Sequence, residues 1–198
     1  MQFAANHALA EKGMTNDVEF INVNLPEGEH KSAAFLAKNP FGLVPILELD
    51  DGTIISECTA ITEYIDNLRG EPTLTGNTAK DKAVIHMMQR RAEACLLDAA
   101  ATYFHHATPG LGSKIETYQC AEWGNKQRER AIEGMHYLNK VLEKEPFVAG
   151  MHFTMADITV FAGLACVNLA KIMIPVECTS LTEWQIKIEQ RPSVIASA

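Results

Sequence analysis

The fold of this chain is indicated most clearly by residues 44–55, VPILELDDGTII. Two runs rich in Ile and Leu flank the turn residues Asp50-Asp51-Gly52, a pattern typical of a β-hairpin. After Glu57 the apolar residues recur at helical spacing, at Ile61, Tyr64, Ile65 and Leu68. This stretch therefore predicts a hairpin followed by a helix whose apolar stripe packs against it.

The residues before the hairpin predict three further elements. The opening stretch to Lys12 favours a helix, with Gly13 as its C-cap. Residues 18–23, VEFINV, are rich in β-formers and predict a strand. Residues 31–38 predict a short helix that ends before Asn39-Pro40. We expect residues 1–70 to form one α/β unit with the order helix, strand, helix, hairpin, helix.

The remainder of the chain is predicted to be helical throughout. A polar, turn-rich break at residues 71–77 separates it from the first unit, so the second domain covers residues 78–198. One long helix is expected from Thr78 to about Ala107, and a last one over residues 180–190. Thr154 and Asp157 form a capping-box-like start to the nearly uniform apolar run 158–167, which predicts a helix buried on all sides.

Charge and composition exclude several classes of function. The chain has 198 residues, of which 47% are hydrophobic, and its formal charge is −8. Such a charge opposes binding to nucleic acid and to anionic membranes. The five cysteines are odd in number and widely spaced, with no metal-ligand spacing, so neither a disulfide framework nor a zinc site is expected. No apolar run is long enough to cross a bilayer and the start does not resemble a secretory signal, which predicts a cytoplasmic protein.

Several strings together resemble one known family, the cytosolic glutathione transferases. These strings are residues 28–32 (GEHKS), 39–45 (NPFGLVP), 57–65 (ECTAITEYI), 103–111 (YFHHATPGL) and 153–159 (FTMADIT). The first two look like the plant phi class, and the other three are closer to the fungal and bacterial group related to the second yeast enzyme. The resemblance implies an N-terminal thioredoxin-like α/β domain and an all-α C-terminal helical bundle. It also implies glutathione as co-substrate, no metal, and a homodimer.

The resemblance also implies which residues bind glutathione. Val44, which precedes a cis Pro45, would pair its backbone with the cysteinyl amide of glutathione. This pairing needs a sheet edge that no other strand occupies. Glu57 would accept the glutamyl ammonium, and the backbone N–H of Cys58 would hold the glutamyl carboxylate at a helix N-terminus. His30 and Lys31 would face the glycine carboxylate. The alternatives are an ordinary Val-Pro at a strand start, a Glu favoured by the helix dipole, and a solvated loop at residues 30–31.

The catalytic group is harder to identify from the residues. In the family a hydroxyl or similar donor after the first strand stabilises the thiolate of glutathione. This sequence begins instead at a stretch that resembles the helix after that strand. We therefore expect a missing upstream segment that holds this strand. The candidates within the chain are His105, His106 and Ser113, and the alternative for the histidines is a surface position near a helix end.

Three functions are compatible with these residues. The leading one is conjugation of glutathione to small apolar electrophiles by thiolate attack, as in detoxification. The second is a glutathione-dependent disulfide or peroxide reductase on the same fold. The third is a protein that binds glutathione without turnover.

Overall fold

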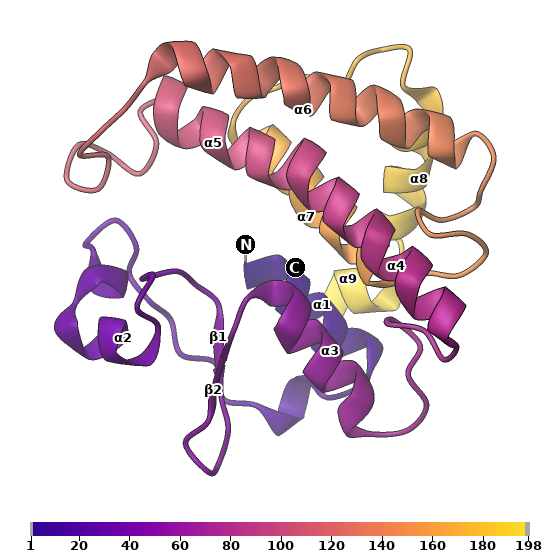
Figure 1. Ribbon diagram of the computed structural model, residues 1–198, viewed down its shortest axis with the longest axis horizontal. Coiled ribbons are helices and arrows are strands. Elements are labelled where there is room, and N and C mark those ends of the chain that lie inside the picture. Colours follow the sequence, from indigo (N-terminus) through magenta and orange to yellow (C-terminus); the bar gives the residue numbers. More distant parts are fainter. Residues whose placement is uncertain (1, 197–198) are drawn as a thin grey trace.

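The computed structural model describes the backbone of residues 2–196 and the side chains of residues 5–196. A small N-terminal part with two short strands lies against a larger helical part (Figure 1). The N-terminal part contains α1 (Gln2–Glu11), α2 (Ala33–Lys38), β1 (Ile46–Glu48), β2 (Ile54–Ser56) and α3 (Cys58–Leu68). The helical part contains α4 (Ala79–Ala92), α5 (Asp98–Ala107), α6 (Ala121–Leu142), α7 (Met155–Leu169), α8 (Thr179–Glu189) and α9 (Pro192–Ala196).

The hairpin is confirmed. β1 and β2 pair antiparallel with Leu47 opposite Ile55, and the backbone bond from the N–H of Leu49 to the carbonyl of Thr53 continues the ladder to the turn. At its other end the ladder stops at Ile46, because Pro45 carries no N–H to donate. The helix predicted after Glu57 is α3, and it packs on both strands and on α1.

The strand predicted at residues 18–23 is wrong. These residues run without regular secondary structure, and in the described part of the chain β1 and β2 are the only paired strands. High β-propensity does not make a strand unless a second segment supplies a ladder of hydrogen bonds. Phe20 and Ile21 of this segment are 50% and 71% exposed.

The long helix predicted after residue 78 is confirmed, with one irregularity. Thr78 caps α4 through a capping box with Asp81, and the helix continues to Ala107 through one π-helical turn, Glu93–Leu97. The predicted last helix corresponds to α8, but the short helix α9 follows it. Pro192 is the first residue of α9, a position where proline is well tolerated.

Helix α7 lies where the two parts meet. Its start is the predicted capping box, in which the carboxylate of Asp157 accepts from the backbone N–H and the hydroxyl of Thr154. Ile158 and Ala162 pack with the buried face of α1 and α3, while Val160 and Leu164 belong to the core of the helical part. A helix that fills two cores must be apolar on most sides, which explains the uniform run 158–167.

Candidate functional site

The end of the hairpin leaves the backbone of Val44 unpaired. Because Ile46 pairs with Ser56, Val44 and Cys58 each lie two residues beyond that pair, at the same end of the hairpin. The peptide bond between Val44 and Pro45 is cis, as expected. Within residues 2–196 neither the N–H nor the C=O of Val44 is hydrogen-bonded. Both groups are therefore available to an extended ligand backbone.

Glu57 begins α3 in an unusual backbone conformation. Its φ is 71° and its ψ is 122°, in a region that side chains rarely adopt and that costs on the order of 1–3 kcal/mol. The side chain is exposed and makes no capping hydrogen bond. The first backbone N–H groups of any helix lack an intrahelical acceptor. A carboxylate and an anion-binding helix terminus thus lie within one turn of each other.

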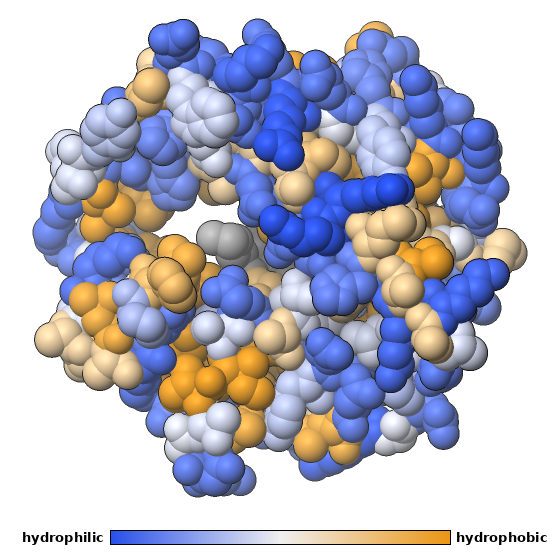
Figure 2. Space-filling model, viewed as in Figure 1, coloured by the Kyte–Doolittle hydropathy of each residue, from blue (hydrophilic) through white to orange (hydrophobic). Residues whose placement is uncertain are grey.

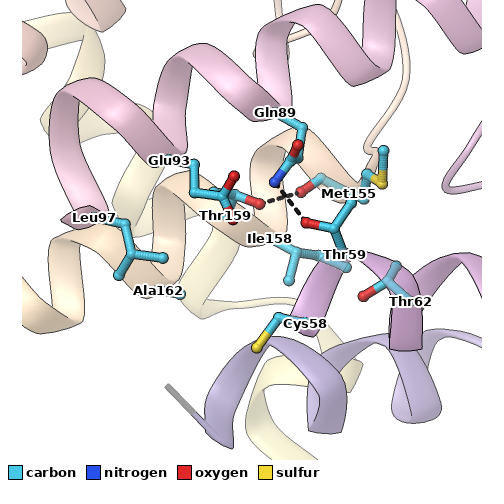
Figure 3. Close-up of a pocket in the computed structure, with 10 residues that line it drawn as sticks. All are labelled: Cys58, Thr59, Thr62, Gln89, Glu93, Leu97, Met155, Ile158, Thr159 and Ala162. Carbon is cyan, nitrogen blue, oxygen red and sulfur yellow. Dashed lines mark hydrogen bonds between the residues drawn. The ribbon is translucent and has the colours of Figure 1, made fainter. Parts of the chain in front are cut away.

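The thiol of Cys58 lines an internal cavity. Figure 3 shows this cavity between α3, α4 and α7, where the side-chain amide of Gln89 donates to the hydroxyl of Thr59 at 2.7 Å. The cavity volume is about 20 Å³, enough for about one water molecule. Burial raises the pKa of the Cys58 thiol to about 11. The side chain is therefore a protonated thiol at neutral pH, and only the backbone of Cys58 is suited to hold an anion.

His30 and Lys31 lie beside the loop that leads to Val44. The ammonium of Lys31 donates to the carbonyls of Phe41 and Gly42, at 3.3 and 3.0 Å. His30 is only 5% exposed, and its Nδ1 has no hydrogen-bond partner among the described residues. Burial, together with the charge of Lys31, lowers the pKa of His30. The structure thus brings the 30–31 segment, the Val44 loop and the start of α3 to one end of the hairpin.

The three candidate catalytic residues lie at the other side of the site, at the end of α5 and in the loop after it. His105 Nδ1 is 2.8 Å from a carboxylate oxygen of Glu116. His106 Nδ1 instead accepts from the backbone N–H of Cys120 at 3.1 Å. Ser113 is exposed in a turn of the loop. In the described part of the chain no hydrogen bond or ion pair joins these three residues to the groups at Val44 and Glu57.

A hollow separates α5 from the loop between α2 and β1, at the left of Figure 2. The loop after α5 approaches the N-terminal part at the edge of this hollow, where Lys114 and Glu27 form an ion pair of 2.7 Å. Glu27 lies three residues before His30. This ion pair therefore links the loop that follows His105 and His106 to the segment that leads to His30 and Lys31.

Glu116 and Gly42 are site residues that the sequence did not reveal. Glu116 is eleven residues from His105, and its contact depends on how the loop folds back, which no residue pattern predicts. Gly42 has a φ of +59°, and a Cβ there would lie 2.7 Å from the carbonyl oxygen of His30. Its place in the NPFGLVP string was the available signal.

Neither a metal site nor a membrane-spanning helix is found among the described residues. In the part of the chain that the structure describes, no group of three His, Cys, Asp or Glu side chains is arranged to hold a metal ion. Among the described helices, none combines the length and the apolar character needed to span a bilayer.

Two family models and a curated yeast protein match this chain. Residues 4–68 match the model of the glutathione S-transferase N-terminal domain, and residues 115–196 match that of the C-terminal domain. Glutathione S-transferase 2 of Saccharomyces cerevisiae is 59% identical over 187 residues, which cover 94% of this chain and 80% of that protein.

Solved structures give the same result. The crystal structure of Gtt2 from Saccharomyces cerevisiae has a TM-score of 0.98 at 56% identity, covering 100% of this chain and 95% of that one. A glutathione S-transferase domain-containing protein from Marinobacter aquaeolei VT8 has a TM-score of 0.95 at 50% identity, covering 97% and 94%. The chain belongs to the glutathione S-transferase family.

Proposed function

We propose that this glutathione S-transferase joins the thiol of glutathione to small apolar electrophiles, as in detoxification. Glutathione carries an ammonium and a carboxylate at its glutamyl end, a central amide, and a carboxylate at its glycine end. The described residues offer Glu57, the N-terminus of α3, the open backbone of Val44, and Lys31, in that order along one end of the hairpin. In the proposed binding mode the groups of the tripeptide meet these residues in the same order.

The main support for this proposal is the register of the hairpin. The register that pairs Ile46 with Ser56 places the open backbone of Val44 and the first turn of α3 side by side. An extended tripeptide that hydrogen-bonds to Val44 then has its glutamyl end within reach of Glu57. Neither feature alone would select a peptide whose head group carries both an ammonium and a carboxylate.

The electrophile is assigned to the hollow on the α5 side. Tyr103, Phe104 and Leu111 are half-buried on α5 and in the loop after it, and we assign to their exposed parts the apolar surface that the electrophile would contact. Tyr103 and Phe104 also pack against the core of the helical part. Such surface, with few polar groups, suits a small apolar molecule. The reaction joins the two substrates by thiolate attack, so the rate depends on positioning and on removal of the thiol proton.

Retention on immobilised glutathione, followed by activity assays, tests the proposal. We expect the protein to be retained and, after elution with glutathione, to convert a chromogenic aryl halide. The Glu57→Gln variant is expected to bind glutathione about tenfold or more weakly, because a charge-assisted hydrogen bond contributes roughly 1.5–3 kcal/mol. Glu63→Gln is the matched control, since Glu63 is an exposed carboxylate farther along α3, and it should bind as the wild type does.

The other outcomes of this experiment distinguish the alternatives. No retention overturns the proposed site. Retention with activity only toward a disulfide or peroxide identifies a reductase, and retention without either activity identifies a binding protein. Equal effects of the two Glu→Gln changes overturn the role of Glu57.

The proposal also covers the localisation, the oligomeric state and the domain bounds of the protein. We take the protein to be a cytoplasmic homodimer, with domains at residues 1–70 and 78–198 and a linker at 71–77. The five cysteines are all thiols, which fits a reducing compartment. Sedimentation equilibrium measures the oligomeric state, and a monomer at micromolar concentration would contradict the dimer.

A further inference from the structure

The loop between α5 and α6 folds back so that one carboxylate oxygen contacts two groups. Oε1 of Glu116 is 2.8 Å from His105 Nδ1 and also 2.8 Å from the backbone nitrogen of Leu111, whose N–H it accepts. The Glu116 side chain is 9% exposed, whereas the His105 side chain is 39% exposed. A mostly buried carboxylate thus holds a histidine whose ring still reaches solvent.

The loop leaves this carboxylate little room to move. A Cβ on Gly110, where φ is +56°, would lie 2.2 Å from Oε1 of Glu116, so a side chain at this position would displace the carboxylate. The side-chain amide of Gln119 donates to the carbonyls of His105 and Thr108, both at 2.7 Å. The end of α5 and the carboxylate are therefore fixed relative to each other.

These contacts give the two neighbouring histidines opposite tautomers. A carboxylate accepts the Nδ1–H of His105, so in the neutral ring Nε2 carries the lone pair. His106 Nδ1 accepts the N–H of Cys120, so its neutral ring carries the proton on Nε2. Of the two, His105 is the one able to accept a proton at Nε2. Within the described residues no hydrogen bond occupies that atom.

We propose that Glu116 is a positioning residue for this transferase: it holds His105 in the Nδ1–H tautomer, so that Nε2 takes the proton of the glutathione thiol. This inference rests on the proposed function. The S–H proton passes to Nε2, directly or through one water, and the sulfur attacks the electrophilic carbon. With an aryl halide the carbon–halogen bond breaks, the halide leaves, and His105 returns its proton to solvent.

Kinetics and histidine NMR on the full chain test this role. We expect Glu116→Ala to lower kcat for an aryl halide about 10–100-fold while the KM for glutathione stays within twofold, because the carboxylate acts on the base and not on the tripeptide. Glu116→Gln keeps an oxygen acceptor and should recover most of the loss. Glu27→Gln removes the other carboxylate that anchors this loop and should leave kcat unchanged.

Nitrogen-15 spectra of the histidines give a readout that loss of loop structure alone would not reproduce. The His105 signals should show the Nδ1–H tautomer in the wild type and in Glu116→Gln, and a mixture in Glu116→Ala. The His106 signals, held by the backbone of Cys120, should stay the same in all three. Assignment follows from the spectrum of His105→Gln.

Each other outcome overturns the proposal. A wild-type His105 with its proton on Nε2, or a Glu116→Ala variant with normal kcat, refutes the role of Glu116 while conjugation by the wild type leaves the proposed function intact. A fall in kcat that Gln does not recover, with an unchanged tautomer, also refutes it. A wild type that conjugates nothing refutes the proposed function and the role of Glu116 together.

Discussion

Substitution of Gly42 is expected to weaken glutathione binding, whereas the same substitution at Gly52 is not. Both glycines have positive φ, +59° at Gly42 and +84° at Gly52, so alanine costs roughly 1–2 kcal/mol of backbone energy at either position. At Gly52 the added Cβ meets no heavy atom within 4 Å. At Gly42 it would lie 2.7 Å from the carbonyl oxygen of His30 and 3.0 Å from Nζ of Lys31.

The size of the effect follows from these distances. Ordinary contact begins near 3.4 Å, so the Gly42→Ala loop must move away from His30 by about 0.7 Å. The loop carries Val44 two residues later, and Lys31 is bonded to the Gly42 carbonyl. We expect Gly42→Ala to lower the free energy of unfolding by about 2–3 kcal/mol and to raise the KM for glutathione roughly tenfold, equivalent to about 1.4 kcal/mol.

Urea denaturation and conjugation kinetics measure the two quantities. Gly52→Ala should lose about 1–2 kcal/mol of stability and keep its KM for glutathione within twofold. The KM for the electrophile should change little in either variant. If the two variants have equal stability and equal KM for glutathione, the contact between Gly42 and residues 30–31 does not hold the binding loop, and the reasoning is wrong.

Three further predictions concern buried groups. Burial raises the pKa of Asp66, but hydrogen bonds from Thr75 and Lys12, among others, outweigh burial and hold the pKa below its usual value. The stability that these bonds contribute is therefore present above about pH 4 and is lost as the pH falls below it. Asp66→Asn should flatten this loss of stability at acid pH, as measured by urea unfolding at pH 3–7. Cys58, with a pKa of about 11, should react with iodoacetamide far more slowly than a free cysteine at pH 7.5, and its reaction should become faster as the pH rises. Peptide mass spectrometry that finds Cys58 modified before the other cysteines would contradict this prediction. Asp157→Ala leaves several buried donors without an acceptor and should lower the free energy of unfolding by roughly 3–5 kcal/mol, as measured by chemical denaturation. A loss under 1 kcal/mol would show that these hydrogen bonds add little to stability.

Local patterns predicted the parts of the fold that local interactions determine. The turn at residues 50–52, the capping box at Thr154 and the spacing after Glu57 each involve residues within a few positions of one another. The hairpin, the buried helix α7 and the helix α3 were found for this reason. The strand at residues 18–23 was wrong because a strand depends on a partner segment, which β-propensity does not supply.

The candidate site also has a part that could be predicted from the sequence and a part that could not. Val44, the cis bond before Pro45 and Glu57 were expected from the family resemblance of the strings that contain them, and the register of one hairpin brings Val44 and Glu57 to the same end of the structure. Glu116 could not be found, because its contact with His105 depends on the path of an irregular loop. The π-helical turn at Glu93–Leu97 also had no signal, since its residues are ordinary helix formers.

The central claim is that one tripeptide is bound along Val44 and the first turn of α3 at the same time. Titration of glutathione into nitrogen-15-labelled protein tests it directly through the amide signals of Val44 and Thr59. We predict that both signals shift with a single dissociation constant and that Glu57→Gln weakens both equally. Shifts at only one of the two amides, or two different dissociation constants, would contradict the account.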